Sequence, residues 1–317
     1  MKAVIIFFIA CFSLKNYCQV VQINTGTIEN LIDLSVFKKN IMIGGWTGYV
    51  VKSNDECNTL SPLSTPNAAN YATRLKRLDS NNVLLLSYTP SQTLLFKSSD
   101  GGLNWIQKSN TTGSFSHDFG FFDSLVGIMT SGITFHKTID GGINWTQGVS
   151  PFQIGTNLLK TFGDSLVCMG GENVTGGGLV LSKNRGNTWG YGWGSFGSIQ
   201  MTDCFFLNKD TIFGVTKGGA FTKTTNGGAN WDSSSETPIF NSYGVYFKRA
   251  NEGYVVGMND QNKGIIVKTT DLGQTWSKTL AGMSDVAYGN GIFVAIGNST
   301  SGKISSSTDG KSWTSQS

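Results

Sequence analysis

The apolar residues of this chain form short runs bounded by glycine or asparagine, and they form no long stripe of helical period. Residues 241–280 contain four such runs, SYGVYFK, GYVVGM, GIIVKTT and WSKTLA, each rich in β-branched or aromatic residues. Short runs of this composition predict β-strands. The same grouping recurs as LIDLSVF, IMIGGW, YVVKSN and TLSPL near the N-terminus, and as DVAYGN, IFVAIGN, KISSST and WTSQS at the C-terminus. The pattern therefore predicts an all-β protein built from units of four strands.

A short polar motif ending in tryptophan recurs about every forty residues, a period typical of repeat architectures. Its copies are SSDGGLNW (98–105), TIDGGINW (138–145), SKNRGNTW (182–189), TTNGGANW (224–231), TTDLGQTW (269–276) and the shorter STDGKSW (307–313). An eroded copy, SNDECNTL (53–60), keeps Ser53 and Asp55 but has Cys57 in place of a glycine and Leu60 in place of the tryptophan. A period near forty residues is that of a four-stranded propeller blade, so these copies predict seven blades.

The motif has a structural interpretation that requires no ligand. An acidic or amide side chain and a hydroxyl can bond the backbone amides of a tight turn, and glycine accepts a positive φ. A tryptophan between neighbouring sheets would bury on the order of 150 to 250 Å². The positions expected to act in this way are Asp55, Asp100, Asp140, Asn184, Asn226, Asp271 and Asp309 in the turns, and Trp105, Trp145, Trp189, Trp231, Trp276 and Trp313 after them.

The motif resembles the Asp-box, or BNR, repeat S/T-x-D-x-G-x-T-W. The copies at 98–105, 138–145 and 269–276 fit it closely, whereas Asn184 and Asn226 replace the acid in two others. The chain therefore resembles the Asp-box β-propellers, which include sialidases, xyloglucan hydrolases, the sortilin ectodomain and the photosystem II assembly-factor type; it is closest in style to the last two. The resemblance implies a seven-bladed propeller of four-stranded antiparallel blades with Asp-box hairpins, in which the box lies away from any active centre.

The N-terminus reads as a targeting segment. Residues 3–14 are apolar apart from Ser13, which is too short to span a bilayer comfortably but long enough for the core of a signal peptide. We expect a signal peptide at 1–19, a single propeller domain at 20–317, no transmembrane span after cleavage, and a secreted, periplasmic or cell-envelope location. The segment FIAC, ending at Cys11, faintly resembles a lipobox, so a lipid anchor remains the alternative. Residues 20–26 are expected to add an edge strand to the last blade.

Composition and cysteine content limit the possible ligands. With 41 glycines in 317 residues and 14% charged residues, the chain fits a turn-dense all-β protein. Its net charge of +4 is not gathered into a basic segment, which argues against nucleic acid. The cysteines show no C-x-x-C and no nearby histidine, so neither a metal site nor a cofactor is predicted. Cys168 and Cys204 fall on consecutive predicted blades, where they either pair or pack as small apolar side chains.

An enzymatic function is the weaker prediction. The resemblance to sialidases would require an arginine triad and an R-I-P motif, but R-I-P is absent and the chain has only Arg74, Arg77, Arg185 and Arg249. Other propeller glycosidases need two carboxylates across a cleft. Acids outside the motifs include Asp79, Asp118, Asp123, Asp164, Glu172, Asp203, Asp210, Glu236, Glu252, Asp260 and Asp285. Spacing does not separate a catalytic pair from turn acids, so no catalytic residue is assigned and a carbohydrate-active hydrolase stays as the alternative.

Binding is expected on loops that join the last strand of one blade to the first strand of the next, because such loops gather on one face of a propeller. Residues 190–198, GYGWGSFGS, supply Tyr191, Trp193 and Phe196, and the loop at 61–74 ends with Tyr71 and Arg74. Exposed rings could stack on a sugar or anchor a protein, unless they cover neighbouring blades. The hypothesis is an exported, non-catalytic, monomeric propeller that binds a protein or glycan partner with one face.

Overall fold

The computed structural model of the chain describes residues 31–37, 40–45, 48–54, 60–66, 72–88, 92–112, 116–152, 155–173, 176–194, 200–261, 264–281, 285–289, 292–296, 304–307 and 314–316. These residues form 28 β-strands and contain no α-helix, so the all-β prediction is confirmed for them. The sequence predictions for the signal peptide, for the edge strand at 20–26 and for five residues fall outside the described residues. Those five residues are Asp55, Tyr71, Phe196, Asp309 and Trp313.

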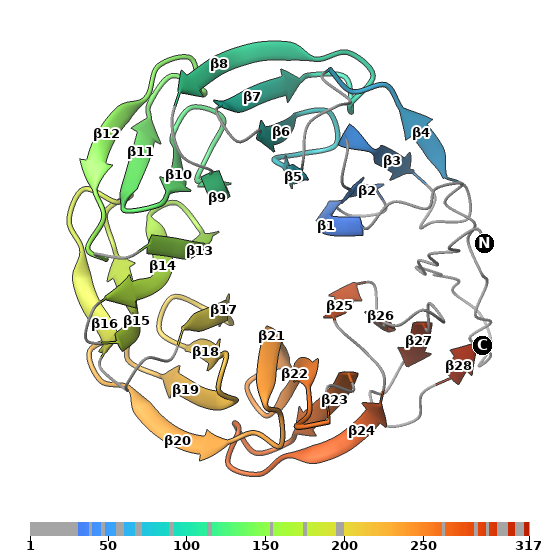
Figure 1. Ribbon diagram of the computed structural model, residues 1–317, viewed down its shortest axis with the longest axis vertical. Coiled ribbons are helices and arrows are strands. Elements are labelled where there is room, and N and C mark those ends of the chain that lie inside the picture. The colour runs from blue at the N-terminus through green and yellow to red at the C-terminus, as the bar shows by residue number, and fades with distance from the viewer. Residues whose placement is uncertain are drawn as a thin grey trace. The chain divides into compact units, whose positions relative to one another are not determined.

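The described strands form seven four-stranded sheets, and within each sheet every strand is hydrogen-bonded to its neighbour in sequence (Figure 1). The pairings are antiparallel, so each sheet is a simple meander. The chain divides into two compact units, residues 1–148 and 149–317. Each unit is described separately.

Unit 1 contains three sheets, with β12 ending one residue beyond it. Their strands are β1 (Leu31–Phe37), β2 (Asn40–Gly45), β3 (Val50–Ser53) and β4 (Ser61–Leu63); β5 (Ala72–Arg77), β6 (Val83–Tyr88), β7 (Gln92–Ser98) and β8 (Ile106–Thr112); and β9 (Ser116–Phe121), β10 (Gly127–Ser131), β11 (Thr134–Thr138) and β12 (Thr146–Val149).

Unit 2 contains the other four sheets. Their strands are β13 (Gly155–Phe162), β14 (Leu166–Asn173), β15 (Gly176–Ser182) and β16 (Gly190–Gly194); β17 (Met201–Phe206), β18 (Ile212–Thr216), β19 (Ala220–Thr224) and β20 (Asp232–Glu236); β21 (Asn241–Arg249), β22 (Glu252–Met258), β23 (Gly264–Thr269) and β24 (Ser277–Ala281); and β25 (Asp285–Gly289), β26 (Ile292–Ile296), β27 (Ile304–Ser307) and β28 (Thr314–Gln316).

The core of each unit lies between consecutive sheets. In unit 2, one cluster joins the first two sheets through side chains such as Leu158, Leu179 and Met201, and a second centres on the stacked rings of Phe213 and Phe247, whose centroids are 3.5 Å apart. Sheets covered on both faces have buried residues on both sides of each strand. This explains why the middle strands read as continuous apolar runs rather than as an alternation: all five residues of β18 are buried.

Five turns that carry the repeated motif share one hydrogen-bond network. In the second of them, Thr138 Oγ1 donates to Asp140 Oδ1 at 2.8 Å and accepts from the N–H groups of Asp140 and Gly142, at 3.3 and 2.9 Å. The same three bonds recur around Ser98, Ser182, Thr224 and Thr269. Each hydroxyl thus closes the turn that leads out of the third strand of its sheet. We call residues 98–105, 138–145, 182–189, 224–231 and 269–276 the repeated turns.

The side chain two residues after the hydroxyl completes each network. Asp140 Oδ1 accepts from the N–H groups of Ile143 and Asn144 at 3.0 and 2.9 Å, and Asn226 Oδ1 accepts from Asn230 N–H at the same 2.9 Å. An asparagine therefore reproduces the backbone contact of the acid. These donors lower the pKa of the Asp140 carboxyl to about 2, mainly through the backbone N–H of Asn144. The pKa values of Asp100 and Asp271 are lowered to about 2 by equivalent bonds.

The glycine four residues after the hydroxyl lies against the preceding sheet in the turns that contain Gly102, Gly142, Gly228 and Gly273. Gly142 has φ of +88°, and a Cβ there would collide with Leu95 of β7. Trp145 then packs against the core cluster between the second and third sheets, and its Nε1–H donates to Ser109 Oγ on β8 at 3.0 Å. The turn therefore attaches one sheet to the sheet before it, because both the glycine and the tryptophan contact that neighbour.

Candidate binding surface

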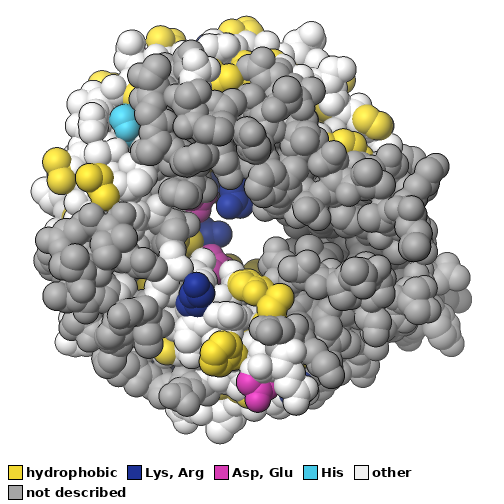
Figure 2. All heavy atoms as spheres, viewed as in Figure 1, with side chains coloured by type: hydrophobic (Ala, Val, Ile, Leu, Met, Phe, Trp, Pro, Cys, Tyr) yellow, Lys and Arg dark blue, Asp and Glu magenta, His cyan; other side chains and the backbone are white. Residues whose placement is uncertain are grey.

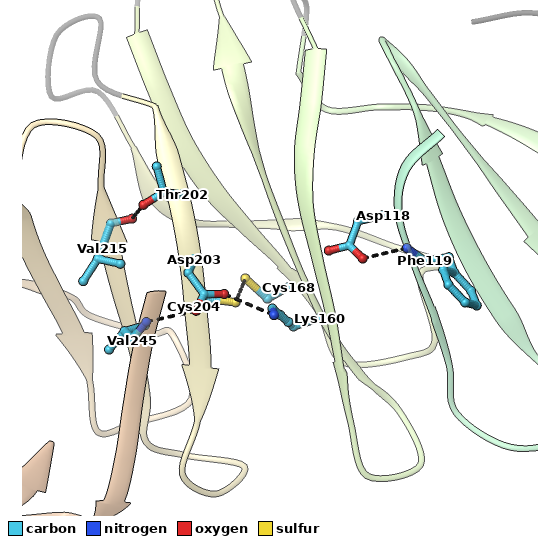
Figure 3. Close-up of polar contacts among 9 residues, drawn as sticks. All are labelled: Asp118, Phe119, Lys160, Cys168, Thr202, Asp203, Cys204, Val215 and Val245. Carbon is cyan, nitrogen blue, oxygen red and sulfur yellow. Dashed lines mark hydrogen bonds and ion pairs between the residues drawn. The ribbon is translucent and has the colours of Figure 1, made fainter. Parts of the chain in front are cut away.

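The first strands of consecutive sheets in unit 2 are linked by side chains as well as by packing. Strands β13, β17 and β21 lie next to one another in that order. Asp203 of β17 forms an ion pair with Lys160 of β13, at 3.2 Å between Nζ and Oδ1, and its Oδ2 accepts from the N–H of Val245 on β21 at 3.0 Å. Figure 3 shows Lys160, Asp203 and Val245 in line across the three strands. A single carboxylate therefore connects three sheets.

The two partners of this ion pair differ in exposure. The Lys160 side chain is 47% exposed, whereas that of Asp203 is only 16% exposed. The carboxylate is therefore enclosed by the protein, whereas about half of the lysine side chain is exposed to solvent. The ion pair with Asp203 therefore fixes the position of the Lys160 ammonium group.

Aromatic side chains flank this position on the same strands. Phe205 of β17 contacts Tyr246 of β21 with ring centroids 5.0 Å apart and an angle of 64° between the ring planes. Both residues are half-buried. An edge-to-face contact of this kind rigidifies the junction of the two strands.

Tyr243 owes its exposure to an irregularity in β21. Ser242 pairs with Gly257 and Gly244 pairs with Val256, which leaves Tyr243 as an extra residue without a cross-strand partner. Its side chain is 40% exposed. A bulge re-aims the side chain that it carries, and bulges are common next to functional sites. The neighbouring strand β17 has the same kind of register shift at Thr202.

Phe240 is 61% exposed, although the segment that carries it is firmly attached. This segment joins β20 to β21. Thr237 donates to Gly219 O through both its N–H (3.0 Å) and its Oγ1 (2.8 Å), Ile239 is buried, and the N–H of Phe240 donates to Met258 O at 2.8 Å. A large apolar ring is therefore held in solvent by an anchored backbone, which lowers the entropy lost on binding.

We define the first-strand surface as Lys160, Thr202, Asp203, Phe240 and Tyr243. It combines two exposed rings, one of them just before β21, with an ion pair and a polar bulge residue, Thr202, on neighbouring strands. In the lower half of Figure 2, hydrophobic, Lys or Arg, and Asp or Glu side chains are visible in the region where Figure 1 draws β17 to β24. This chemistry suits recognition of a peptide-like ligand, in which apolar side chains and a carboxylate occur together.

Three of the residues that the sequence predicted for binding, Tyr191, Trp193 and Arg74, lie on strands other than β17 and β21. Tyr191 and Trp193 are on β16, paired with Val180 and Leu179, so the first half of the expected 190–198 loop is a strand; the positions of their side chains are not described. Arg74 is on β5 in unit 1, opposite Leu86, and is half-buried.

Phe240 and Tyr243 were not singled out from the sequence. They could have been, because TPIFNSYG places two rings between a proline and a glycine at a connection of the same type as 190–198. The ion pair of Lys160 and Asp203 is harder to predict from sequence, because the sequence does not show which charged residues on different strands are in contact.

Several of the acids considered as hydrolase candidates hold the fold together. Asp79 Oδ1 accepts from the N–H groups of Asn81 and Asn82, both at 2.8 Å, and the Asn82 bonds lower the pKa of Asp79. Asp123 closes its hairpin in the same way, accepting from Leu125 and Val126. Each of these carboxylates acts as a turn cap.

Glu252 is buried in an ion pair. Its Oε1 lies 2.9 Å from Lys268 Nζ, and its Oε2 lies 2.8 Å from Arg249 Nη2. Burial alone would raise the pKa of Glu252, but the bond and charge of Lys268 outweigh it, so the pKa is lowered. Such a carboxylate stays ionised and paired, which does not suit a general acid.

The described residues contain no group of three or more His, Cys, Asp and Glu side chains that could hold a metal ion. His117 lies on β9 and His136 on β11, where burial lowers the pKa of the His136 imidazole. Within the same part of the chain, no helix is long and apolar enough to cross a membrane.

The sequence matches no protein-family model and no curated protein. Solved structures do match. A structure described as YCF48 bound to a D1 peptide is 14% identical, with a TM-score of 0.67, 85% of this chain covered and 90% of the other. YCF48 from Cyanidioschyzon merolae is 14% identical, with a TM-score of 0.66, 84% of this chain covered and 92% of the other.

A third similar structure is an enzyme. The GH74 xyloglucanase from Xanthomonas campestris is 11% identical, with a TM-score of 0.58, 89% of this chain covered and 60% of the other. Identities this low carry no information on activity. They show the fold alone, and that fold is the β-propeller.

Proposed function

We propose that this chain is a non-catalytic, seven-bladed β-propeller that binds an extended protein segment on its first-strand surface. The observation that carries the proposal is the pair of exposed rings, Phe240 and Tyr243, on an anchored backbone at the start of β21, the strand that Asp203 connects to Lys160. Aromatic anchors are the usual source of binding energy at protein interfaces. Here little conformational entropy remains to be lost on the propeller side, because the backbone that carries Phe240 is already hydrogen-bonded.

The charge of the surface favours a ligand with a carboxylate. Asp203 is already bonded to Lys160 and to the Val245 N–H, and the Lys160 side chain is half-exposed, so an incoming acid would meet the lysine side chain. Such a contact steers association and sets the register of the ligand more than it adds affinity. Binding of a D1 peptide by YCF48, a protein of the same fold, is consistent with peptide recognition by a propeller.

The proposal also includes three features that the sequence predicts: Asp-box hairpins, export and a monomeric state. The repeated turns are Asp-box hairpins, the chain is exported and acts as a monomer, and Tyr71, Arg74, Tyr191, Trp193 and Phe196 are candidates for a second contact region. Support for the hairpins comes from the identical networks around Ser98, Thr138 and Thr269.

The test uses the purified full chain and a displayed library of peptides in which one fixed position is Asp or Glu. We expect saturable binding of a peptide subset, at least tenfold weaker for a Phe240→Ala, Tyr243→Ala double variant, because truncated hot-spot rings commonly cost more than ~1 kcal/mol. The matched control is Leu103→Ala with Ile139→Ala, two apolar residues that are 60% and 72% exposed on repeated turns. Equal binding by the double variant and the wild type would overturn the assignment of the surface.

A second pair of variants separates the two regions. Arg74→Ala with Trp193→Ala should leave the selected peptides bound if the first-strand surface suffices, whereas loss of binding would move the contact to the residues predicted from sequence.

The hydrolase alternative is tested directly. Xyloglucan, sialylated glycans and other polysaccharides should release no reducing ends, because Asp79, Asp123 and Glu252 are held by turns or ion pairs. Release that is lost on replacing one of the remaining acids, such as Asp118 or Asp260, would establish an enzyme and contradict the non-catalytic proposal.

A further inference from the structure

Two buried cysteines meet between the first two sheets of unit 2. Cys168 lies on β14 and Cys204 on β17, with exposed fractions of 0% and 3%. Both are free thiols, and their Sγ atoms are 2.8 Å apart (Figure 3). Leu158, Leu179 and Met201 surround them in one core cluster. The two sulfur atoms are therefore already in contact, although they come from different sheets.

The thiols lie directly behind the ion pair of the first-strand surface. Cys168 is the cross-strand partner of Lys160 in the β13–β14 ladder, and Cys204 follows Asp203 on β17. A bond between the sulfur atoms would join β17, which carries Asp203, to β14, which is paired with the Lys160 strand β13.

We propose that Cys168 and Cys204 form a disulfide that joins the two sheets when the chain folds in an oxidising environment. The oxidant is an external disulfide, of a small molecule or of a protein. One thiolate attacks it to give a mixed disulfide, and the second thiolate displaces the external thiol. The two cysteines lose two protons and two electrons, and the external disulfide is reduced to two thiols.

Burial determines when this reaction occurs. Desolvation raises the pKa of the Cys168 thiol well above its ordinary value, so this sulfur is not a reactive thiolate in the native protein, and both sulfur atoms of the pair are buried. Exchange is therefore fast while the strands are still open and slow once they have packed. The same shielding protects the finished disulfide from reductants.

The disulfide would also stabilise the fold. It closes a loop between positions 36 residues apart, and such a cross-link restricts the unfolded chain. We expect the melting temperature of the oxidised protein to lie on the order of 5 to 10 °C above that of the reduced protein. This inference does not depend on the proposed binding function.

The experiment uses the full chain with Cys11, Cys18 and Cys57 changed to serine, which leaves only the pair. The protein is unfolded and reduced, then refolded with oxidised and reduced glutathione, quenched with acid, unfolded again and alkylated. We expect a mass lower by two hydrogen atoms, no alkylated cysteine, and a peptide that links Cys168 to Cys204. Native protein oxidised without unfolding should react far more slowly.

Two control variants keep the proposal falsifiable. Cys168→Ser and Cys204→Ser, each in the same background, should refold to the same circular dichroism spectrum and lack the stabilisation by oxidant. The proposal is overturned if the refolded pair is fully alkylated, or if each sulfur carries glutathione in a natively folded protein. Small apolar packing would then be the only role of the two thiols.

Discussion

The repeated turns and the first-strand surface use the same polar chemistry to opposite effect. In a turn such as 138–145, Thr138 and Asp140 donate and accept only within the turn itself. On the first-strand surface, Asp203 is likewise engaged, but its partner Lys160 and the nearby rings of Phe240 and Tyr243 remain exposed. The polar side chains of the turn therefore bond to the turn itself, whereas the first-strand surface exposes two aromatic rings to solvent.

This contrast distinguishes structural residues from binding residues where a repeated motif resembles a binding site. An acid beside two glycines looks like a binding site, yet in the turns its bonding capacity is used by backbone amides. Asn184 and Asn226 preserve these contacts with a neutral side chain, which a site depending on charge would not tolerate. Exposure of large side chains on an anchored backbone is the more informative sign.

The largest effect is expected inside a turn. Thr269→Val keeps the shape of the side chain but leaves the buried N–H of Gly273 without its 2.8 Å acceptor. The free energy of unfolding should fall by about 1 to 3 kcal/mol, the cost of an unsatisfied buried donor. Chemical denaturation measures it, with Thr270→Val, at the adjacent exposed position, as the control. Peptide binding should persist. Its loss in a folded variant would show that the repeated turns also take part in binding.

Asp203 should show an intermediate effect, because it serves both the fold and the surface. Asp203→Ala removes the acceptor of the buried Val245 N–H and should destabilise the protein by about 1 to 2 kcal/mol. Asp203→Asn keeps an acceptor and should cost less. Lys160→Met should change stability by less than ~0.5 kcal/mol, since a half-exposed ion pair contributes little. An equal decrease in the free energy of unfolding for all three variants in urea denaturation would show that the ion pair, and not the hydrogen bond to Val245 N–H, stabilises the fold.

Acid should weaken the turns but leave their asparagine copies unaffected. The pKa of Asp140 is lowered to about 2 in the folded protein from an ordinary value of 3.8. A lowered folded-state pKa contributes stability that is fully present above the ordinary value and is lost as pH falls through the folded value. Thermal unfolding between pH 4 and pH 2 should therefore show a smaller decline for Asp140→Asn than for the wild type. Parallel curves would indicate that the carboxylate contributes no more than the amide.

The smallest effect on stability is expected at the rings. Phe240→Ala should change the free energy of unfolding by less than ~0.5 kcal/mol, because the ring is largely exposed and its backbone bond is retained. The same variant should weaken peptide binding several-fold in isothermal titration. A marked loss of stability would mean that Phe240 belongs to the fold, and the distinction between the two regions would fail there.

The strands were predictable because sheets covered on both faces make continuous apolar runs. The four runs read in residues 241–280 correspond to β21, β22, β23 and β24. The sequence predicts a loop at 190–194, because three glycines interrupt the strand pattern, but the structure has strand β16 there. Both segments, 241–280 and 190–194, contain strand-forming residues, but in the second segment glycines separate them.

The candidate site was less predictable, because it depends on contacts between repeats. Asp203 and the Val245 N–H that it accepts are 42 residues apart, and the same separation joins Ser35 Oγ to the N–H of Arg77 in unit 1. Such a contact follows from how two sheets stack rather than from any local pattern. The exposure of Tyr243 depends on a single extra residue in one ladder, which alternation of polar and apolar residues does not reveal.

That extra residue gives the repeats a way to diversify. Register shifts occur near the start of five first strands among the described residues, namely β1, β9, β13, β17 and β21. Where one residue stands outside the ladder, as Thr202 and Tyr243 do, its replacement leaves the pairing of its neighbours intact. Mutation could therefore sample new ligand contacts at such a position, as at the exposed Tyr243, whereas the Thr202 hydroxyl also donates to Val215 O.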